Sequence, residues 1–154
     1  MNWLKLIVSL VLPQLAGIIG SLFTVKSIPN WYAALSKPSF NPPNWIFGPV
    51  WITLYLIMGI SFYLLWIKTD TPNFGFLFSL FILQLILNAL WSIIFFGLKS
   101  PGYALFEIAF LWISIILCIV YFYPVSKIAS LLLVPYVLWV SFASVLNYYI
   151  FKLN

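Results

Sequence analysis

The stretch from residue 74 to residue 98, FGFLFSLFILQLILNALWSIIFFGL, decides the fold class, because no charged residue interrupts it. A helix needs about 20 apolar residues to cross the roughly 30 Å of hydrocarbon in a bilayer, and this run is long enough. It lacks the alternation of apolar and polar residues that is typical of barrel strands. Since lipid cannot satisfy the backbone of an open sheet edge, the run predicts a membrane-spanning helix.

Four more apolar runs of similar length lie on either side of this one, at about residues 4–25, 45–67, 103–122 and 128–151. A lysine stands at nearly every boundary, as is typical of side chains that anchor helices at headgroup level. Only 6% of the 154 residues are charged and 65% are hydrophobic, which excludes a water-exposed surface. We therefore predict that residues 1–154 form one all-α domain, a bundle of five transmembrane helices.

The first run also has features of a signal peptide, with a basic start and small residues near Ala16 and Gly20. The apolar stretch continues to Val25 and no A-x-A site follows it, so we expect a retained helix. Ala16 with Gly20, and Gly17 with Ser21, have the four-residue spacing of small residues that lets another helix approach closely.

The connections between the runs differ in length. Those at 69–73, 100–102 and 123–126 are short and predict antiparallel neighbours, whereas the segment at about 27–44 is long and rich in proline. Because prolines restrict their own backbone and that of the preceding residue, this segment is the candidate for a stiff lid. Within the last run, Pro135 removes a helical hydrogen bond and predicts a kink.

Missing residue types constrain the chemistry. The chain has no histidine and no arginine, one cysteine (Cys118), and two acids, Asp70 and Glu107. A zinc site, a Ser-His-Asp triad or a histidine-ligated haem cannot be assembled from one such chain. We expect no metal and no resident cofactor, and the formal net charge of +5 reflects lysine anchors rather than a nucleic-acid surface.

A few polar residues fall inside the runs and have two possible roles. Glu107 is either an ion or proton site, or a carboxylate that lies near a helix N-terminus or faces the bundle interior. Gln84 and Asn88 are four residues apart, so they share a helix face that should point inward, either as hydrogen bonds between helices or as ligand contacts. Trp139 lies near the middle of its span, where its N–H needs a partner that a pocket can supply.

Three blocks of sequence carry a resemblance to a known family. They are WYAALSKPSFNPPNWIFGPVWITLYLIMG (31–59), QLILNALWSIIFFG (84–97) and LLVPYVLWVSFASVLNYYIFKLN (132–154). In order and over essentially the whole chain, they resemble the translocator protein family, also called tryptophan-rich sensory proteins or peripheral-type benzodiazepine receptors. The resemblance implies a five-helix membrane bundle, often dimeric, whose cavity binds porphyrins such as protoporphyrin IX and synthetic benzodiazepine-site ligands.

The same resemblance implies a set of ligand-binding residues. Together with the two inward-facing amides, they are Trp51 on the second helix, Gln84, Asn88 and Trp91 on the third, Trp139 and Ala143 on the fifth, and a covering loop that contains Trp31, Tyr32, Pro42 and Pro43. A flat apolar ligand is well held by flat side chains, and a stiff lid loses little entropy on closing. The alternative is that these aromatic residues form an interfacial belt.

The family's sterol-recognition stretch corresponds to Leu146, Tyr148 and Lys152. An aliphatic residue, a tyrosine and a basic residue arise readily at helix ends, where tyrosine and lysine anchor anyway. The animal members have arginine where this chain has Lys152. We therefore do not assign a sterol as the natural ligand.

Three function classes follow. The first is a membrane receptor or sensor that binds porphyrins. The second is a light- and oxygen-dependent enzyme that degrades a bound porphyrin, with Trp51 and Trp139 as electron donors, because the pigment itself supplies the chemistry. The third is a tetrapyrrole or sterol carrier. We rank them in that order, and we expect a homodimer in contact with membrane lipid, in a bacterial cell membrane, with no nucleic-acid partner.

Overall fold

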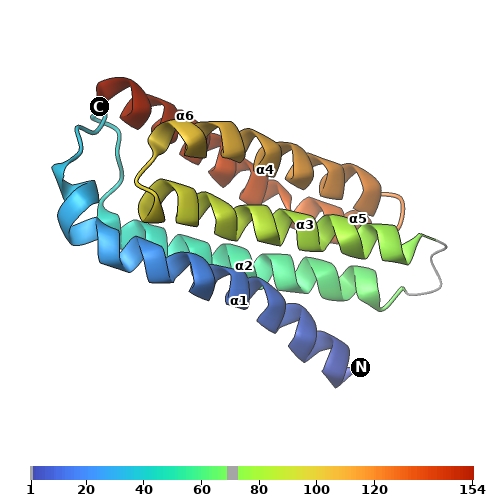
Figure 1. Cartoon of the computed structure of the whole chain (residues 1–154). Coiled ribbons are helices and arrows are strands. Elements are labelled where there is room, and N and C mark those ends of the chain that lie inside the picture. Colours follow the sequence, from blue (N-terminus) through green and yellow to red (C-terminus); the bar gives the residue numbers. More distant parts are fainter. Residues whose placement is uncertain (1, 69–72) are drawn as a thin grey trace.

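The computed structural model describes residues 2–68 and 73–154, so Met1 and most of the expected connection at 69–73 lie outside the described residues. Within these ranges, five helical segments are long and apolar enough to cross a membrane. The predicted all-α bundle of five spans is confirmed (Figure 1). In chain order the elements are α1 (Trp3–Ser27), the π-helical turn η1 (Ile28–Tyr32), α2 (Asn44–Trp66), α3 (Phe74–Ser92), the π-helical turn η2 (Ile93–Gly97), α4 (Pro101–Phe122), α5 (Lys127–Leu132) and α6 (Val134–Leu153).

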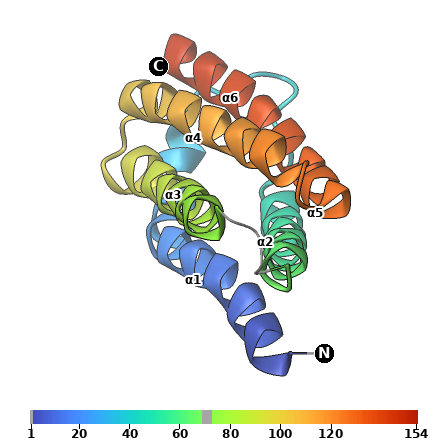
Figure 2. The same ribbon diagram turned by 90° about the vertical axis from the view of Figure 1, so that its right-hand side faces the viewer.

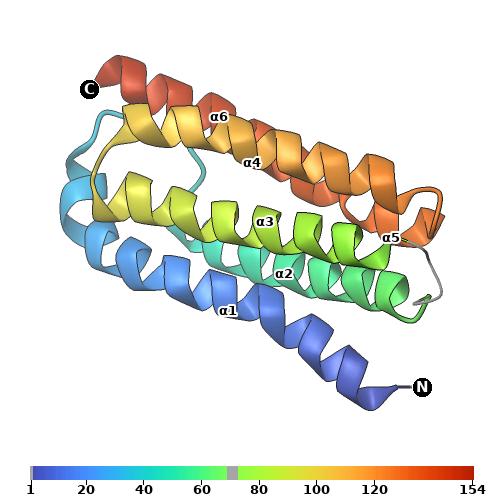
Figure 3. The same ribbon diagram turned by 45° about the vertical axis from the view of Figure 1, so that its right-hand side comes forward.

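The long helices lie roughly parallel or antiparallel to one another in a bundle. Figure 2 shows α4 and α6 on one side of the bundle, α1 on the opposite side, and α2 and α3 between them. Helix α1 packs against α2 and α3, and α4 packs against α3 and α6. The N-terminus and the C-terminus lie at opposite ends of the bundle, as an odd number of spans requires (Figure 3).

The fifth span is interrupted near Pro135, where the sequence predicted a kink within one helix. Helix α5 ends at Leu132 and α6 begins at Val134, so Pro135 lies in the first turn of a new helix. A proline is tolerated there because the amide of the first turn has no partner within the helix. The proline therefore separates two helices instead of bending one.

The expected lid is shorter than the segment at 27–44. Helix α1 continues directly into η1, so Trp31 and Tyr32 lie on a helical extension and not on the covering loop. The extension is held by the Ser27 hydroxyl, which donates to the backbone oxygen of Phe96 at 2.7 Å. Because Pro29 falls in the first turn of η1, it does not break the helical path, and the irregular connection runs only from residue 35 to residue 43.

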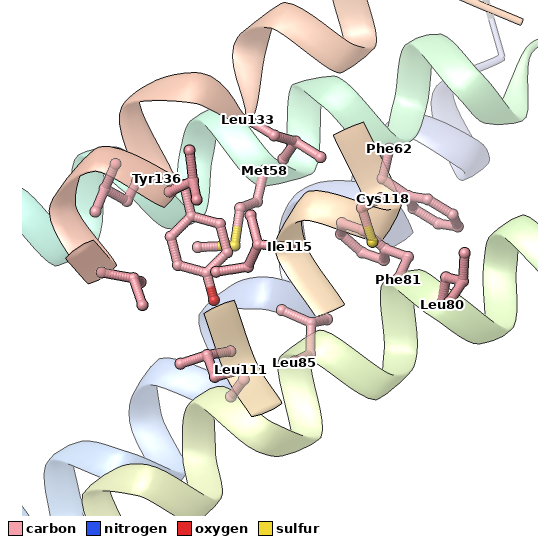
Figure 4. Close-up of a cluster of buried hydrophobic side chains, with 14 of the residues drawn as sticks. Met58, Phe62, Leu80, Phe81, Leu85, Leu111, Ile115, Cys118, Leu133 and Tyr136 are labelled. Atoms are coloured by element: carbon pink, nitrogen blue, oxygen red, sulfur yellow. The ribbon is translucent and has the colours of Figure 1, made fainter. Parts of the chain in front are cut away.

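The half of the bundle that holds α5, the end of α2 and the start of α3 is filled by apolar side chains. We call it the packed half, and Figure 4 shows its cluster of buried residues. Phe62 of α2 stacks on Phe81 of α3 with ring centroids 4.4 Å apart and an interplanar angle of 6°. Cys118 is fully buried in the same cluster as a free thiol, where it packs as a small hydrophobic residue.

Candidate functional site: an aromatic cavity between the helices

The other half of the bundle, which we call the hollow half, contains a cavity of about 500 Å³. Its walls come from the second half of α1 with η1, the first half of α2, the end of α3 with η2, and α6 from Trp139 onward. The lining residues are Gln14, Gly17, Ile18, Ser21, Thr24, Val25, Ile28, Tyr32, Asn44, Trp45, Phe47, Gly48, Trp51, Ile52, Tyr55, Trp91, Ser92, Phe95, Phe96, Trp139, Ala143, Leu146, Asn147 and Ile150.

Two of the walls are formed by tryptophan rings that rest on other aromatic rings. Trp51 stacks on Tyr55 with centroids 5.5 Å apart and an interplanar angle of 27°. Trp139 meets Phe47 edge to face at 6.0 Å. These contacts restrict the indole rings, so the cavity presents preformed flat surfaces to a ligand.

Asn88 lies behind this wall and ties three helices together. The Tyr55 hydroxyl donates to Asn88 Oδ1 at 2.7 Å, and Asn88 Nδ2 donates to the Tyr136 hydroxyl at 3.0 Å. All three side chains are buried. Of the two roles open to Asn88, the structure therefore shows the hydrogen bond between helices, and Asn88 does not line the cavity.

Gln84 lies one turn from Asn88 and faces inward as expected, but its side chain makes no hydrogen bond to the described residues and does not line the cavity. An amide without a partner in this position costs free energy. The predicted inward orientation of Gln84 and Asn88 is confirmed by their burial.

A second set of hydrogen bonds between helices involves Asn147, which the sequence analysis did not single out. Trp91 lines the cavity, and its Nε1 donates to Asn147 Oδ1 at 3.0 Å. Asn147 Nδ2 in turn donates to the backbone oxygen of Pro101 at 2.7 Å, joining α6 to the start of α4. The sequence did contain a signal for Asn147, because an asparagine inside an apolar span needs a hydrogen-bond partner.

Trp139 differs from Trp91 in having no partner for its indole nitrogen. Its Nε1 is buried and unpaired among the described residues, and the ring lines the cavity. A buried donor without an acceptor is costly, and a ligand that offers an acceptor would relieve this cost. Ala143, one turn further along α6, lines the same wall.

The loop at residues 35–43 is fastened to the bundle at several points. The Tyr32 hydroxyl donates to Asn41 Oδ1 at 2.9 Å. Asn154 accepts from the Ser36 backbone N–H and donates to the Ser36 backbone oxygen, both at 3.0 Å. Among the residues assigned to the lid by resemblance, Tyr32 lines the cavity, whereas Trp31, Pro42 and Pro43 do not.

Trp31 packs edge to face on Phe95 at 5.6 Å, so it supports the cavity wall from behind.

The three residues that match the family's sterol-recognition stretch also differ in whether they line the cavity. Leu146 is buried and lines the cavity, while Tyr148 and Lys152 are exposed and do not. The three residues do not form a common surface toward the cavity.

Glu107 of α4 faces the bundle interior and not the cavity. It is buried beyond the first turn of its helix, and neither carboxyl oxygen has a hydrogen-bond partner among the described residues. In the described part of the chain no cluster of three histidine, cysteine or acidic side chains could hold a metal ion. The lining of the cavity itself contains no charged residue.

The fold and the cavity define an integral membrane protein with an aromatic, uncharged binding cavity inside a five-helix bundle. Residues 9–153 match the TspO/MBR family. The chain is 49% identical over 154 residues to the tryptophan-rich protein TspO of Archaeoglobus fulgidus, covering 100% of this chain and 99% of that protein. It is 39% identical to the human translocator protein, covering 92% and 85% of the two chains. It is 31% identical to the tryptophan-rich sensory protein of Cereibacter sphaeroides, covering 81% and 77%.

This chain therefore belongs to the TspO/MBR family, and the resemblance seen in the sequence is confirmed. The names of its relatives support a role as a membrane sensor or receptor.

Proposed function

We propose that the protein is a membrane receptor whose cavity binds flat, largely apolar molecules, with porphyrins such as protoporphyrin IX as the natural class and benzodiazepine-site ligands as synthetic ones. The observation that supports this proposal is the pair of tryptophan walls, Trp51 and Trp139, around a cavity of about 500 Å³. That volume falls in the range of about 300–1,000 Å³ typical of small-molecule sites, which are mostly apolar with few polar groups.

The test is a titration of the purified protein with protoporphyrin IX, followed by the quenching of tryptophan fluorescence. Ala143→Trp, which adds a large ring on the cavity wall, should abolish saturable quenching. Val145→Trp, at an exposed position of α6 that does not line the cavity, is the matched control and should bind as the unmodified chain does. Saturable binding that persists in Ala143→Trp would contradict the proposed site.

A second candidate is the light- and oxygen-dependent degradation of the bound porphyrin. It is favoured by the fact that Trp51 and Trp139, the two indoles expected to donate electrons, both line the cavity. Molecular oxygen is the oxidant, the excited pigment is the reacting group, and the indoles direct its breakdown. The absorption spectrum of the bound pigment, in darkness and in light and with and without oxygen, separates this activity from binding alone.

The remaining expectations concern transport, assembly and location. Carriage of a porphyrin or sterol stays the third candidate, and flux across protein-containing vesicles tests it. We propose a homodimer in a bacterial cell membrane, with close helix approach at the exposed Gly75 and Ser79 of α3. Cross-linking in lipid that yields only monomers would contradict the dimer.

A further inference from the structure

The distance between α1 and α2 changes along their length, as the space around three glycines shows. A Cβ atom added to Gly59 would lie 2.8 Å from the Ser9 backbone oxygen and 2.9 Å from Leu10 Cα. A Cβ atom added to Gly17 would collide with the ring of Tyr55. A Cβ atom added to Gly48 would meet nothing within 4 Å. The two helices therefore touch at Gly59 and Gly17, and they separate toward Gly48.

The exposed part of the cavity lining coincides with this separation. Every lining residue that is exposed belongs to α1 or α2, whereas those from α3, η2 and α6 are buried or half-buried. The large apolar residues among them are strongly exposed: Ile18 56%, Val25 68%, Trp45 74% and Ile52 57%. The cavity thus opens sideways, between the two helices.

The surroundings of this opening indicate what it faces. Its border is mostly apolar, with Ser21 and Asn44 as the polar exceptions, and both helices are long and apolar enough to cross the membrane, so the opening meets lipid. A path past the loop at residues 35–43 would have to displace contacts that hold this loop in place. They are the hydrogen bonds of Asn41 and Asn154 and the ring of Phe40, which packs on Tyr149 at 5.3 Å. The opening thus lies between α1 and α2, whereas the loop is held by contacts with η1 and α6.

We propose that the gap between α1 and α2 at Gly48 is a lateral portal, through which planar apolar molecules dissolved in the bilayer exchange with the cavity while the loop stays in place. Because no cation lines the cavity, any carboxylates of such a molecule remain at the mouth, and the apolar ring system enters first. The ligand class rests on the proposed function, but the portal itself rests on the helix geometry.

The first test is kinetic and uses protoporphyrin IX with protein in lipid vesicles. Gly48→Leu places a side chain in the open space of the portal. Because a blocked passage slows entry and exit together, association and dissociation rates should both fall by about tenfold, and their ratio should change much less than either. Thr53→Leu, an exposed position on the same helix that does not line the cavity, is the control and should leave both rates unchanged.

The loop is tested in the same assay with Asn154→Ala, which removes both hydrogen bonds to Ser36. Under the proposal, the exchange rates stay within about twofold of those of the unmodified chain, since the ligand does not pass the loop. Faster exchange in Asn154→Ala, or unchanged rates in Gly48→Leu, would overturn the portal. A failure of the unmodified chain to bind protoporphyrin would instead overturn the proposed function.

The second test needs no ligand. A nitroxide is attached at Ile52→Cys in a Cys118→Ala background, which removes the one native thiol. Collisions with oxygen, which concentrates in hydrocarbon, should broaden its spectrum far more than collisions with a water-soluble nickel chelate. Greater accessibility to the nickel chelate would show that the opening faces water, and the portal would be wrong even if porphyrin binds.

Discussion

The two halves of the bundle are built from the same apolar helices, yet one is filled and the other is hollow. In the packed half, Phe62 and Phe81 stack face to face, and Gly59 lets α1 touch α2 through its backbone. In the hollow half, the rings of Trp51 and Trp91 lie flat against Tyr55 and Phe95 along their own helices, at 5.5 and 5.0 Å.

This comparison teaches that apolar composition alone does not fill a bundle. The face-to-face pair of Phe62 and Phe81 joins two helices and fills the space between them, whereas Trp51 and Trp91 stack along the chain and leave the space beside them open. Hydrogen bonds through Asn88 and Asn147 fix the walls, so they are held from behind and not by contacts through the cavity. A preformed site of this kind reduces the entropy lost on binding.

The largest expected effect comes from removing a ring in each half. Phe62→Ala leaves a void in a fully buried cluster and should lower the free energy of unfolding by about 3–5 kcal/mol. Phe47→Ala should cost much less, because Phe47 is half-buried and borders an existing cavity. Unfolding in mixed micelles, followed by circular dichroism, measures both. Equal losses would show that the halves do not differ in packing.

The glycines of α2 allow the same comparison with a single added methyl group. Gly59→Ala overpacks against backbone atoms of α1 that cannot move aside, and it should cost about 1–3 kcal/mol of unfolding free energy. Gly48→Ala adds its methyl group to open space, so its free energy of unfolding should change by about 0.5 kcal/mol or less. A destabilised Gly48→Ala variant would argue against the separation of the two helices.

Asn88 tests whether the cavity wall depends on its hydrogen bonds. Asn88→Ala leaves the buried Tyr55 hydroxyl without its acceptor and should cost about 1–3 kcal/mol of stability. Gln84→Met is the matched control one turn away; it removes an amide without described partners and should be neutral or stabilising. If the two variants have equal stability, the hydrogen bonds of Asn88 do not stabilise the cavity wall.

The tryptophans separate binding from photochemistry within the hollow half. Trp51→Phe and Trp139→Phe each keep an aromatic face, so each should cost only about 1 kcal/mol of protoporphyrin affinity. Photobleaching of the bound pigment should slow far more, because phenylalanine is much harder to oxidise than indole. Affinity by fluorescence quenching and bleaching rate at saturation are measured together. Equal bleaching rates in the unmodified chain and both variants would contradict a role of the tryptophans in degradation, and the protein would then be a receptor only.

The smallest effect is expected at the edge of the hollow half. Lys152 is exposed in the last turn of α6 and does not line the cavity, so Lys152→Ala should leave protoporphyrin affinity unchanged. Leu146→Ala, at a buried lining position of the same helix, should weaken binding measurably in the same titration. A large loss of affinity in Lys152→Ala would show that the site extends to the helix end.

The amino-acid sequence by itself determined the five spans, the place of the distortion at Pro135 and the inward faces of Gln84 and Asn88. These features follow from local rules, because lipid requires every backbone group of a span to be paired within it and penalises polar side chains that face it. The family membership was also accessible, since its blocks extend over the whole chain.

Only the tertiary structure decided which aromatic residues line the cavity, and it placed Trp31 behind the wall and Trp139 in it. It likewise paired Asn88 with two tyrosines and Trp91 with Asn147, residues separated by 33 to 56 positions in the chain. Such choices depend on how each helix is rotated about its axis and how far it tilts from its neighbours. In a chain with apolar residues on every face, no local pattern encodes that rotation, and the packing of distant side chains sets it.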